Sequence, residues 1–145
     1  MAAGAIAEKY LKEAYGVEIV AFVSAVGEVS LPHSLDLLHT VTRSDVDKTF
    51  VRCPDAKKSE EMKKVILDAK ADNDSIGGVV TCVCRNVPNG LGEPCFDKLE
   101  AKLAHAMLSI PATKGFEIGS GFEGTKLRGG LPSFFFSFFC WSFVV

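Results

Sequence analysis

Residues 93–121 read EPCFDKLEAKLAHAMLSIPATKGFEIGSG, and this stretch decides the fold class because it places a helix directly before a strand. Glu93-Pro94 predicts the start of the helix, since proline suits the first helical position, where its missing N–H would be unpaired anyway. Pro111 ends the helix because proline cannot continue the hydrogen-bond ladder. Residues 115–121 then predict a short strand. Four apolar side chains at helical spacing predict the buried stripe of the helix: Phe96, Leu99, Leu103 and Met107.

The same alternation of helix and strand extends toward the start of the chain. Residues 76–87 and 17–29 are rich in Val, Ile and Cys or Phe and predict two buried strands. Between them, residues 56–71 predict an amphipathic helix, and residues 30–49 predict a loop with one short helical turn. Residues 2–14 predict a further helix. The pattern therefore predicts a mixed α/β (α+β) class, without fixing the strand order. The two predicted apolar helix faces are Met62, Val65, Ile66 and Ala69, and Ala3, Ile6, Tyr10 and Ala14.

Charge and cysteine content narrow the class of protein. The 145 residues carry 16 basic and 18 acidic side chains, a formal net charge of −2. A nucleic-acid-binding protein normally shows a clustered basic excess, so we expect no nucleic-acid partner. Residues 1–15 are charged and amphipathic, which is unlike a secretory leader. The odd number of cysteines then predicts free thiols in a reducing, cytoplasmic compartment: Cys53, Cys82, Cys84, Cys95 and Cys140.

Residues 131–145 are uncharged and aromatic, with six of the 11 phenylalanines in the last twelve residues. A membrane-spanning helix needs about 20 apolar residues, so the segment is short for an anchor, and we expect no membrane partner. It also lacks helical periodicity. We expect residues 130–145 to be an apolar tail that was not selected to fold with the rest and that aggregates where it is exposed.

Three metal or catalytic patterns can be tested against the sequence. Residues 72–77 begin like a calcium loop, but Ile76 stands at the third ligand position and Val83 at the twelfth. Cys82 and Cys84 lack a second pair of soft ligands at zinc-site spacing, so we expect two buried thiols. The histidines have no sequence context that indicates a nucleophile relay. We therefore predict no metal site and assign no catalytic role to the three histidines: His33, His39 and His105.

Residues 111–115, Pro-Ala-Thr-Lys-Gly, form the corner between the predicted helix and strand. Small residues let a backbone approach a flat ligand closely, and the cation of Lys114 could face an anion. A plain turn has the same composition, because turns far outnumber ligand-binding loops. The residues alone leave both interpretations open.

Several longer segments resemble characteristic segments of chorismate synthase. They are residues 74–80 (DSIGGVV), 86–99 (NVPNGLGEPCFDKL) and 104–122 (AHAMLSIPATKGFEIGSGF). Residues 1–7 (MAAGAIA) resemble the tail of the family's arginine- and serine-containing signature, with Met1 where valine is usual, and residues 53–55 (CPD) also agree. The resemblance is strongest to fungal enzymes. It predicts a partial chorismate synthase domain over residues 1–129, followed by an unrelated Phe-rich tail over residues 130–145.

The resemblance implies a fold, a reaction and an assembly. The fold is a partial β-α-β sandwich of the chorismate synthase type, usually assembled as a cytoplasmic homotetramer. The enzyme is a phosphate lyase that converts 5-enolpyruvylshikimate 3-phosphate to chorismate and phosphate by 1,4-elimination, in the shikimate pathway of aromatic amino acid biosynthesis. The implied cofactor is reduced FMN, which some fungal members reduce themselves with NADPH.

Little of the family's site maps onto these residues. Pro111 and Ala112 match positions that line FMN; bacterial members often have Asn at the first, so Pro111 would contact the flavin through its backbone or ring. The Gly-Glu-Ser-His motif, the second histidine-bearing segment and the Arg-Ser-Ser portion are absent from these 145 residues. No histidine present corresponds to a catalytic one. We therefore expect this chain to be inactive by truncation; the alternative is a non-catalytic fragment that docks on intact subunits as an interaction protein.

Overall fold

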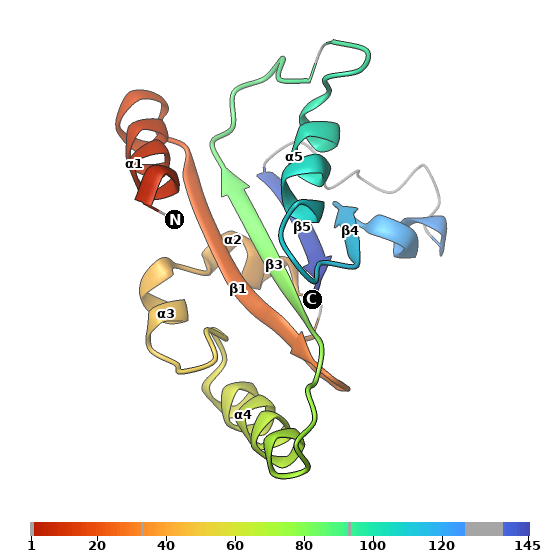
Figure 1. Ribbon diagram of the computed structural model, residues 1–145. Helices are drawn as coiled ribbons and strands as arrows, with labels where there is room; N and C mark the ends of the chain where they lie inside the picture. Colours follow the sequence, from red (N-terminus) through yellow and green to blue (C-terminus); the bar gives the residue numbers. More distant parts are fainter. Residues whose placement is uncertain (1, 33, 93, 127–137) are drawn as a thin grey trace.

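The computed structural model describes residues 2–32, 34–92, 94–126 and 138–145, with only the backbone described for residues 35 and 138–140. They form one sheet of five antiparallel strands in the order β2-β1-β3-β5-β4, with helices against both faces (Figure 1). The predicted mixed class is confirmed. The strands are β1 (Glu18–Val26), β2 (Val29–Ser30), β3 (Gly78–Arg85), β4 (Gly115–Ile118) and β5 (Phe138–Val144). The helices are α1 (Ala2–Tyr15), α2 (Leu35–Thr40), α3 (Arg43–Asp47), α4 (Ala56–Ala71), α5 (Leu99–Leu108) and the 3-10 helix η1 (Gly121–Lys126).

The sheet separates two apolar clusters, because successive strand residues point to opposite faces. In β3, Val83 packs in the first cluster, whereas Cys82 and Cys84 pack in the second. The first cluster lies beneath α2, α3 and α4 and contains Val20, Phe22, Val26, Leu31, Val41, Val46, Cys53, Met62 and Val83. The second lies beneath α5 and joins the two cysteines and Trp141 to Leu103, Met107, Phe116, Ile118 and Phe143, among others.

Helix α4 forms as the sequence predicts, over residues 56–71. The Asp55 side chain accepts a hydrogen bond from the Lys58 N–H at 2.9 Å, which caps the first turn. Met62 is fully buried and Val65 packs against the first cluster, while Ile66 remains 38% exposed. The stripe predicted from spacing is therefore narrower in the fold than in the sequence.

The apolar run over residues 17–29 is two strands rather than the single strand that we predicted. Val26 pairs with Val29, so Gly27 and Glu28 form a tight hairpin turn between β1 and β2. Gly27 has a φ of 55°, a conformation that glycine adopts without steric cost and that two-residue hairpins commonly need. The turn was not predicted because apolar residues continue on both sides of it.

The loop predicted over residues 30–49 contains two short helices, α2 and α3, in place of one helical turn. A capping box begins α3: the Thr42 side chain accepts from the Asp45 N–H, and the Asp45 carboxylate accepts from the Thr42 N–H. Hydrogen bonds from the side chains of Lys48 and Thr42 lower the pKa of Asp45 to about 2. The carboxylate thus stays charged where it serves the cap.

Helix α5 begins at Leu99, so the predicted start at Glu93-Pro94 is wrong. The chain folds back at Gly92, where an added Cβ would lie 2.7 Å from the Leu99 nitrogen, and this close approach occupies the space before the first turn. Phe96 consequently lies outside the helix and is exposed rather than part of the buried stripe. The predicted stripe holds from Leu103 onward, where Leu103 and Met107 pack in the second cluster.

The segment that we expected not to fold contains β5, which pairs with β3 on one side and β4 on the other. Its pairing covers Val79↔Val144 through Arg85↔Phe138 on the β3 side. Trp141 is only 6% exposed and belongs to the second cluster. The residues of this segment that the structure describes are therefore part of the sheet.

Helix α1 forms as predicted, but its apolar face is open. None of its described residues is buried, and Ile6 and Tyr10 are 73% and 60% exposed. An ion pair of 2.5 Å between Glu8 and Arg43 links the helix to α3. Among the described helices, none is long and apolar enough to cross a membrane.

Replacement of Met62 by alanine tests the first cluster. Met62 has no exposed surface, so Met62→Ala should lower the free energy of unfolding by about 2–5 kcal/mol, through lost apolar burial and the cavity left behind. The matched control, Ile66→Ala on the same helix, removes a side chain that is 38% exposed and should cost clearly less. Urea unfolding measures both, and equal losses would contradict the assigned orientation of α4.

Candidate functional site

The corner between α5 and β4 spans residues 109–114 and holds both sequence-predicted site residues. The Thr113 N–H donates to the Ile110 carbonyl at 3.3 Å, which closes a turn over Pro111 and Ala112. The Lys114 N–H donates to the Val144 carbonyl at 2.8 Å, which ties the far side of the corner to β5. The corner is thus a hydrogen-bonded turn held between a helix end and a sheet edge.

Ala112 has a φ of 69°, in the left-handed region that residues other than glycine rarely adopt. Such a conformation costs free energy and persists only where the surrounding structure imposes it. Pro111 and Ala112 are both exposed, and their side chains are small and apolar. A planar ligand could therefore approach the backbone here without displacing a long side chain.

Two polar residues directly follow this exposed pair. Lys114 is exposed, and its ammonium makes no ion pair with any residue that the structure describes. The Thr113 hydroxyl is buried and has no hydrogen-bond partner among the same residues. A buried polar group without a partner is uncommon and costs free energy. The corner therefore combines a small apolar surface with a cation and an unsatisfied hydroxyl.

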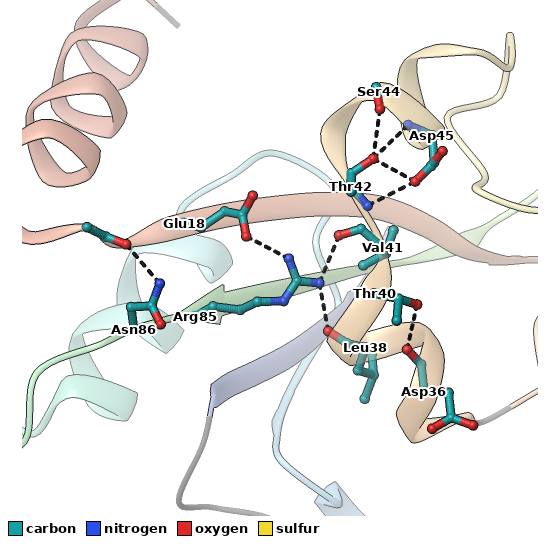
Figure 2. Close-up of polar contacts among 11 residues, drawn as sticks. Glu18, Asp36, Leu38, Thr40, Val41, Thr42, Ser44, Asp45, Arg85 and Asn86 are labelled. Atoms are coloured by element: carbon teal, nitrogen blue, oxygen red, sulfur yellow. Dashed lines mark hydrogen bonds and ion pairs between the residues drawn. The ribbon is translucent and has the colours of Figure 1, made fainter.

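A second polar cluster surrounds Arg85 at the end of β3, as Figure 2 shows. Arg85 Nη1 donates to Glu18 Oε2 at 2.8 Å, and Nη2 donates at 2.8 Å to the carbonyls of Leu38 and Val41. These carbonyls lie at the end of α2, where the helix dipole favours a cation. The Arg85 side chain is only 15% exposed, and both of its terminal nitrogens bond to the fold, whereas the buried Nε has no partner among the described residues. We interpret Arg85 as a structural clamp rather than an anion site.

The thiols of Cys82 and Cys84 are buried in the second cluster, as predicted from the sequence. A hydrogen bond from Cys82 lowers the pKa of Cys84, whereas burial raises the pKa of the Cys53 thiol. No group of three or more potential metal ligands occurs in the part of the chain that the structure describes. His39 lies in α2 and His105 in α5, both exposed, and His33 falls outside the described residues.

Sequence reasoning missed two features that position this region. Arg85 gave no signal, because its partners are main-chain carbonyls more than 40 residues away. The contact from Val144 to the corner was missed because no strand was expected in residues 130–145. A search for apolar segments long enough to span the sheet would have found β5, although not its partners.

Comparison with known proteins places these features in a family. A profile described as chorismate synthase matches residues 1–132. The chorismate synthase of Schizosaccharomyces pombe is 58% identical over 152 aligned positions, which cover 89% of this chain and 38% of that protein. Chorismate synthase aro-2 of Neurospora crassa is 59% identical, covering 90% of this chain and 34% of that protein.

Structural comparison agrees with the sequence matches. A crystal structure of a chorismate synthase superposes with a TM-score of 0.81 at 26% identity, covering 99% of this chain and 53% of that one. The chain spans about a third of the length of the fungal relatives it matches. The predicted family and its fungal character are thereby confirmed.

Substitution of Arg85 by lysine tests the clamp. Lysine keeps the charge but has no planar fork to serve Glu18 and two carbonyls together, so Arg85→Lys should lower the free energy of unfolding by about 1–3 kcal/mol. Arg43→Lys is the control, because Arg43 forms an exposed ion pair and the change should cost no more than about 0.5 kcal/mol. Equal effects in chemical unfolding would show that the buried contacts of Arg85 contribute nothing special.

Proposed function

The chain belongs to the chorismate synthase family, and from this premise we propose that its α5–β4 corner forms one wall of a flavin site of the chorismate synthase type. Pro111 and Ala112 would lie against reduced FMN, through the proline ring and the exposed backbone. The exposure of this pair and the left-handed conformation of Ala112 are the observations that carry the proposal.

The residues present suit such a cofactor. An isoalloxazine ring is flat and largely apolar, so small side chains at an exposed turn allow close contact. Lys114 offers a cation without an ion pair among the described residues, which suits an anionic ligand. The buried Thr113 hydroxyl retains an unused hydrogen-bonding capacity next to it. When bound, reduced FMN would lend an electron or accept a proton transiently during the elimination of phosphate from 5-enolpyruvylshikimate 3-phosphate.

We assign no catalytic residue within the 145 residues. General acid–base groups typically contribute about 10²–10⁴-fold to a reaction rate, and the motifs that carry them in the family are absent from this sequence. The role of these residues is to hold one part of the cofactor and to keep the sheet beneath it in place. Turnover to chorismate and phosphate would need further parts of the family fold.

The cellular setting of the proposal is that of the family. Cys53, Cys84 and Cys95 are free thiols, which supports a reducing compartment such as the cytoplasm. NADPH would act as the reductant of the flavin where the whole fungal-type enzyme is assembled, and the assembly would be a homotetramer.

A second candidate function is docking onto intact chorismate synthase subunits. The open face of α1 favours it, because binding would remove the exposed apolar surface of Ile6 and Tyr10 from contact with water. In this role the chain would act as a non-catalytic interaction partner, and α1 would supply the contact.

Titration of the purified chain with FMN tests the proposed wall. We expect binding at micromolar FMN, and the change in flavin fluorescence measures it. Ala112→Glu should weaken binding by at least about tenfold, or about 1.4 kcal/mol, because it places a carboxylate on the small apolar surface beside an anionic ligand. Ala112→Glu adds no backbone strain beyond that of alanine itself.

The control for this titration is Ala101→Glu, which adds the same charge to an exposed position of α5. Its affinity for FMN should equal that of the unchanged chain. Absence of binding by a folded chain, or equal affinities for all three proteins, would refute the corner as a flavin wall.

Co-expression with an intact fungal chorismate synthase subunit tests the docking function. The chain should co-purify with that subunit, and Ile6→Glu should abolish the association because it places a charge on the open apolar face. Lys9→Glu, on an exposed polar position of the same helix, is the control and should leave the association intact. Retention by both variants would exclude α1 as the contact.

A further inference from the structure

Strand β5 is the only strand that pairs with β4 among the residues the structure describes. The pairs are Gly115↔Val144 through Ile118↔Trp141. On its other side, β5 pairs with β3 over its full length, from Phe138↔Arg85 to Val144↔Val79. Figure 1 shows α5 lying over this part of the sheet, with β4 at its side. The hydrogen bonding of β4, which follows the corner directly, therefore depends on β5.

The end of β5 bonds to the corner itself. The Val144 carbonyl accepts from the Lys114 N–H at 2.8 Å, which fixes the residue that follows the turn over Pro111 and Ala112. The next residue is anchored to β3 by a reciprocal pair: Gly78 N–H to the Val145 carbonyl at 2.9 Å, and Val145 N–H to the Gly78 carbonyl at 3.0 Å. Residues 144–145 thus connect the corner to the central strand.

The other flank of the corner also rests on β5. Helix α5, which leads into the corner, packs through Leu103 and Met107 on the second cluster. That cluster includes Trp141, which is more than nine-tenths buried, and the partly buried Phe143. Alternation along the strand places Trp141 and Phe143 on the same face. Both elements that bound the corner are therefore supported by the same strand.

A polar row on the opposite face fixes the position of β5. Ser142 and Thr81 share a hydrogen bond of 2.8 Å between their hydroxyls, and the Thr81 hydroxyl donates to Ser24 Oγ at 2.7 Å. A slip of one residue would turn every side chain of the strand to the wrong face. It would place Ser142 in the apolar cluster and Trp141 against the hydroxyls. The observed pairing is thus specified by both faces at once.

The comparisons point the same way. The family profile ends at residue 132, whereas the superposition on the solved chorismate synthase covers 99% of this chain. The structural match thus covers more of the chain than the profile does.

From these contacts we propose that β5 is the positioning strand of the corner, with the Val144 carbonyl as the group that holds Lys114 and so the turn over Pro111 and Ala112. The Phe-rich segment would then be unrelated to the family in sequence and yet necessary for the geometry of the wall. The consequence for FMN rests on the proposed function; the structural consequence does not.

Amide exchange of the full-length chain tests this directly. In the unchanged chain, the Lys114 and Gly78 amides should exchange at least about 100-fold more slowly than in an unfolded chain, because they donate to the carbonyls of Val144, the last residue of β5, and Val145, the residue after it. Trp141, the single tryptophan, should show the blue-shifted emission of a buried indole. Unprotected exchange at Lys114 in the folded chain would overturn the proposal, whatever any variant does.

Ser142→Pro removes a strand N–H and the hydroxyl of the polar row, and proline is not accommodated in a central strand. Protection at Lys114 and Gly78 should fall at least about tenfold, and Trp141 emission should shift toward the red. Protection at Ser59, within α4, reports that the helix over the first cluster remains folded. The control, Val144→Thr, changes an exposed β-branched side chain but keeps the carbonyl, and should retain the protection at Lys114, Gly78 and Ser59 and the Trp141 emission.

FMN titration of the same proteins separates the two proposals. Weaker binding by Ser142→Pro than by Val144→Thr supports the positioning role, and equal binding despite lost protection at Lys114 overturns it. If no protein binds FMN while the exchange results are as expected, the flavin wall is refuted and the positioning of the corner by β5 stands.

Discussion

The antiparallel pairing of β3 with β1 on one side and β5 on the other is the constraint on which the rest of the structure depends. An interior strand satisfies its main-chain groups only through both neighbours, and an unpaired buried amide costs about as much as a lost hydrogen bond. Its side chains also divide between the two apolar clusters, with Val83 in one and Cys82 in the other. A change in this pairing would therefore disturb both layers of helices.

The two halves of the sheet use this strand differently. On the β1 side, the hydrogen bond from Val23 N–H to the Arg52 carbonyl and the contacts of Arg85 bring loops and short helices against the sheet. On the β5 side, the sheet supports α5, β4 and the corner between them. Apolar packing is non-directional, whereas these hydrogen bonds fix direction and register. The proposed site lies on the β5 side, where strand pairing fixes the position of β4.

Local chemistry explains which elements could be predicted from the sequence. Helix α4 has an aspartate cap and an apolar stripe, and the corner has Pro111 after a helical stripe, so both were predicted. The prediction of the start of α5 is wrong because Pro94 suits a helix start as well as an irregular loop, and the close approach of Gly92 to Leu99 is not visible in helical spacing. Pattern reasoning sees propensities along the chain and not the space that a neighbour occupies.

The missed features depend on partners distant in sequence. The clamp of Arg85 uses carbonyls of α2, and β5 pairs with a strand about 60 residues earlier. A run of aromatic residues without charge has no period that indicates a strand. Strand β5 forms because β3 offers main-chain groups with which it can pair. The position of Pro111 and Ala112 was predictable, whereas the conformation of Ala112 was not, because nothing about alanine favours a positive φ.

The apolar side chains of the amphipathic helix α1 and those of β5 lie in opposite environments for a physical reason. A helix satisfies its own main-chain hydrogen bonds, so α1 can form while Ile6 and Tyr10 remain exposed. A strand cannot, because its donors and acceptors point sideways and need a neighbouring strand. Strand β5, which contains Trp141, therefore forms regular structure only by joining the sheet, and in doing so it buries that side chain and pairs with one side of β4. Burial of these side chains thus depends on where the main chain finds its hydrogen-bond partners as well as on apolar character.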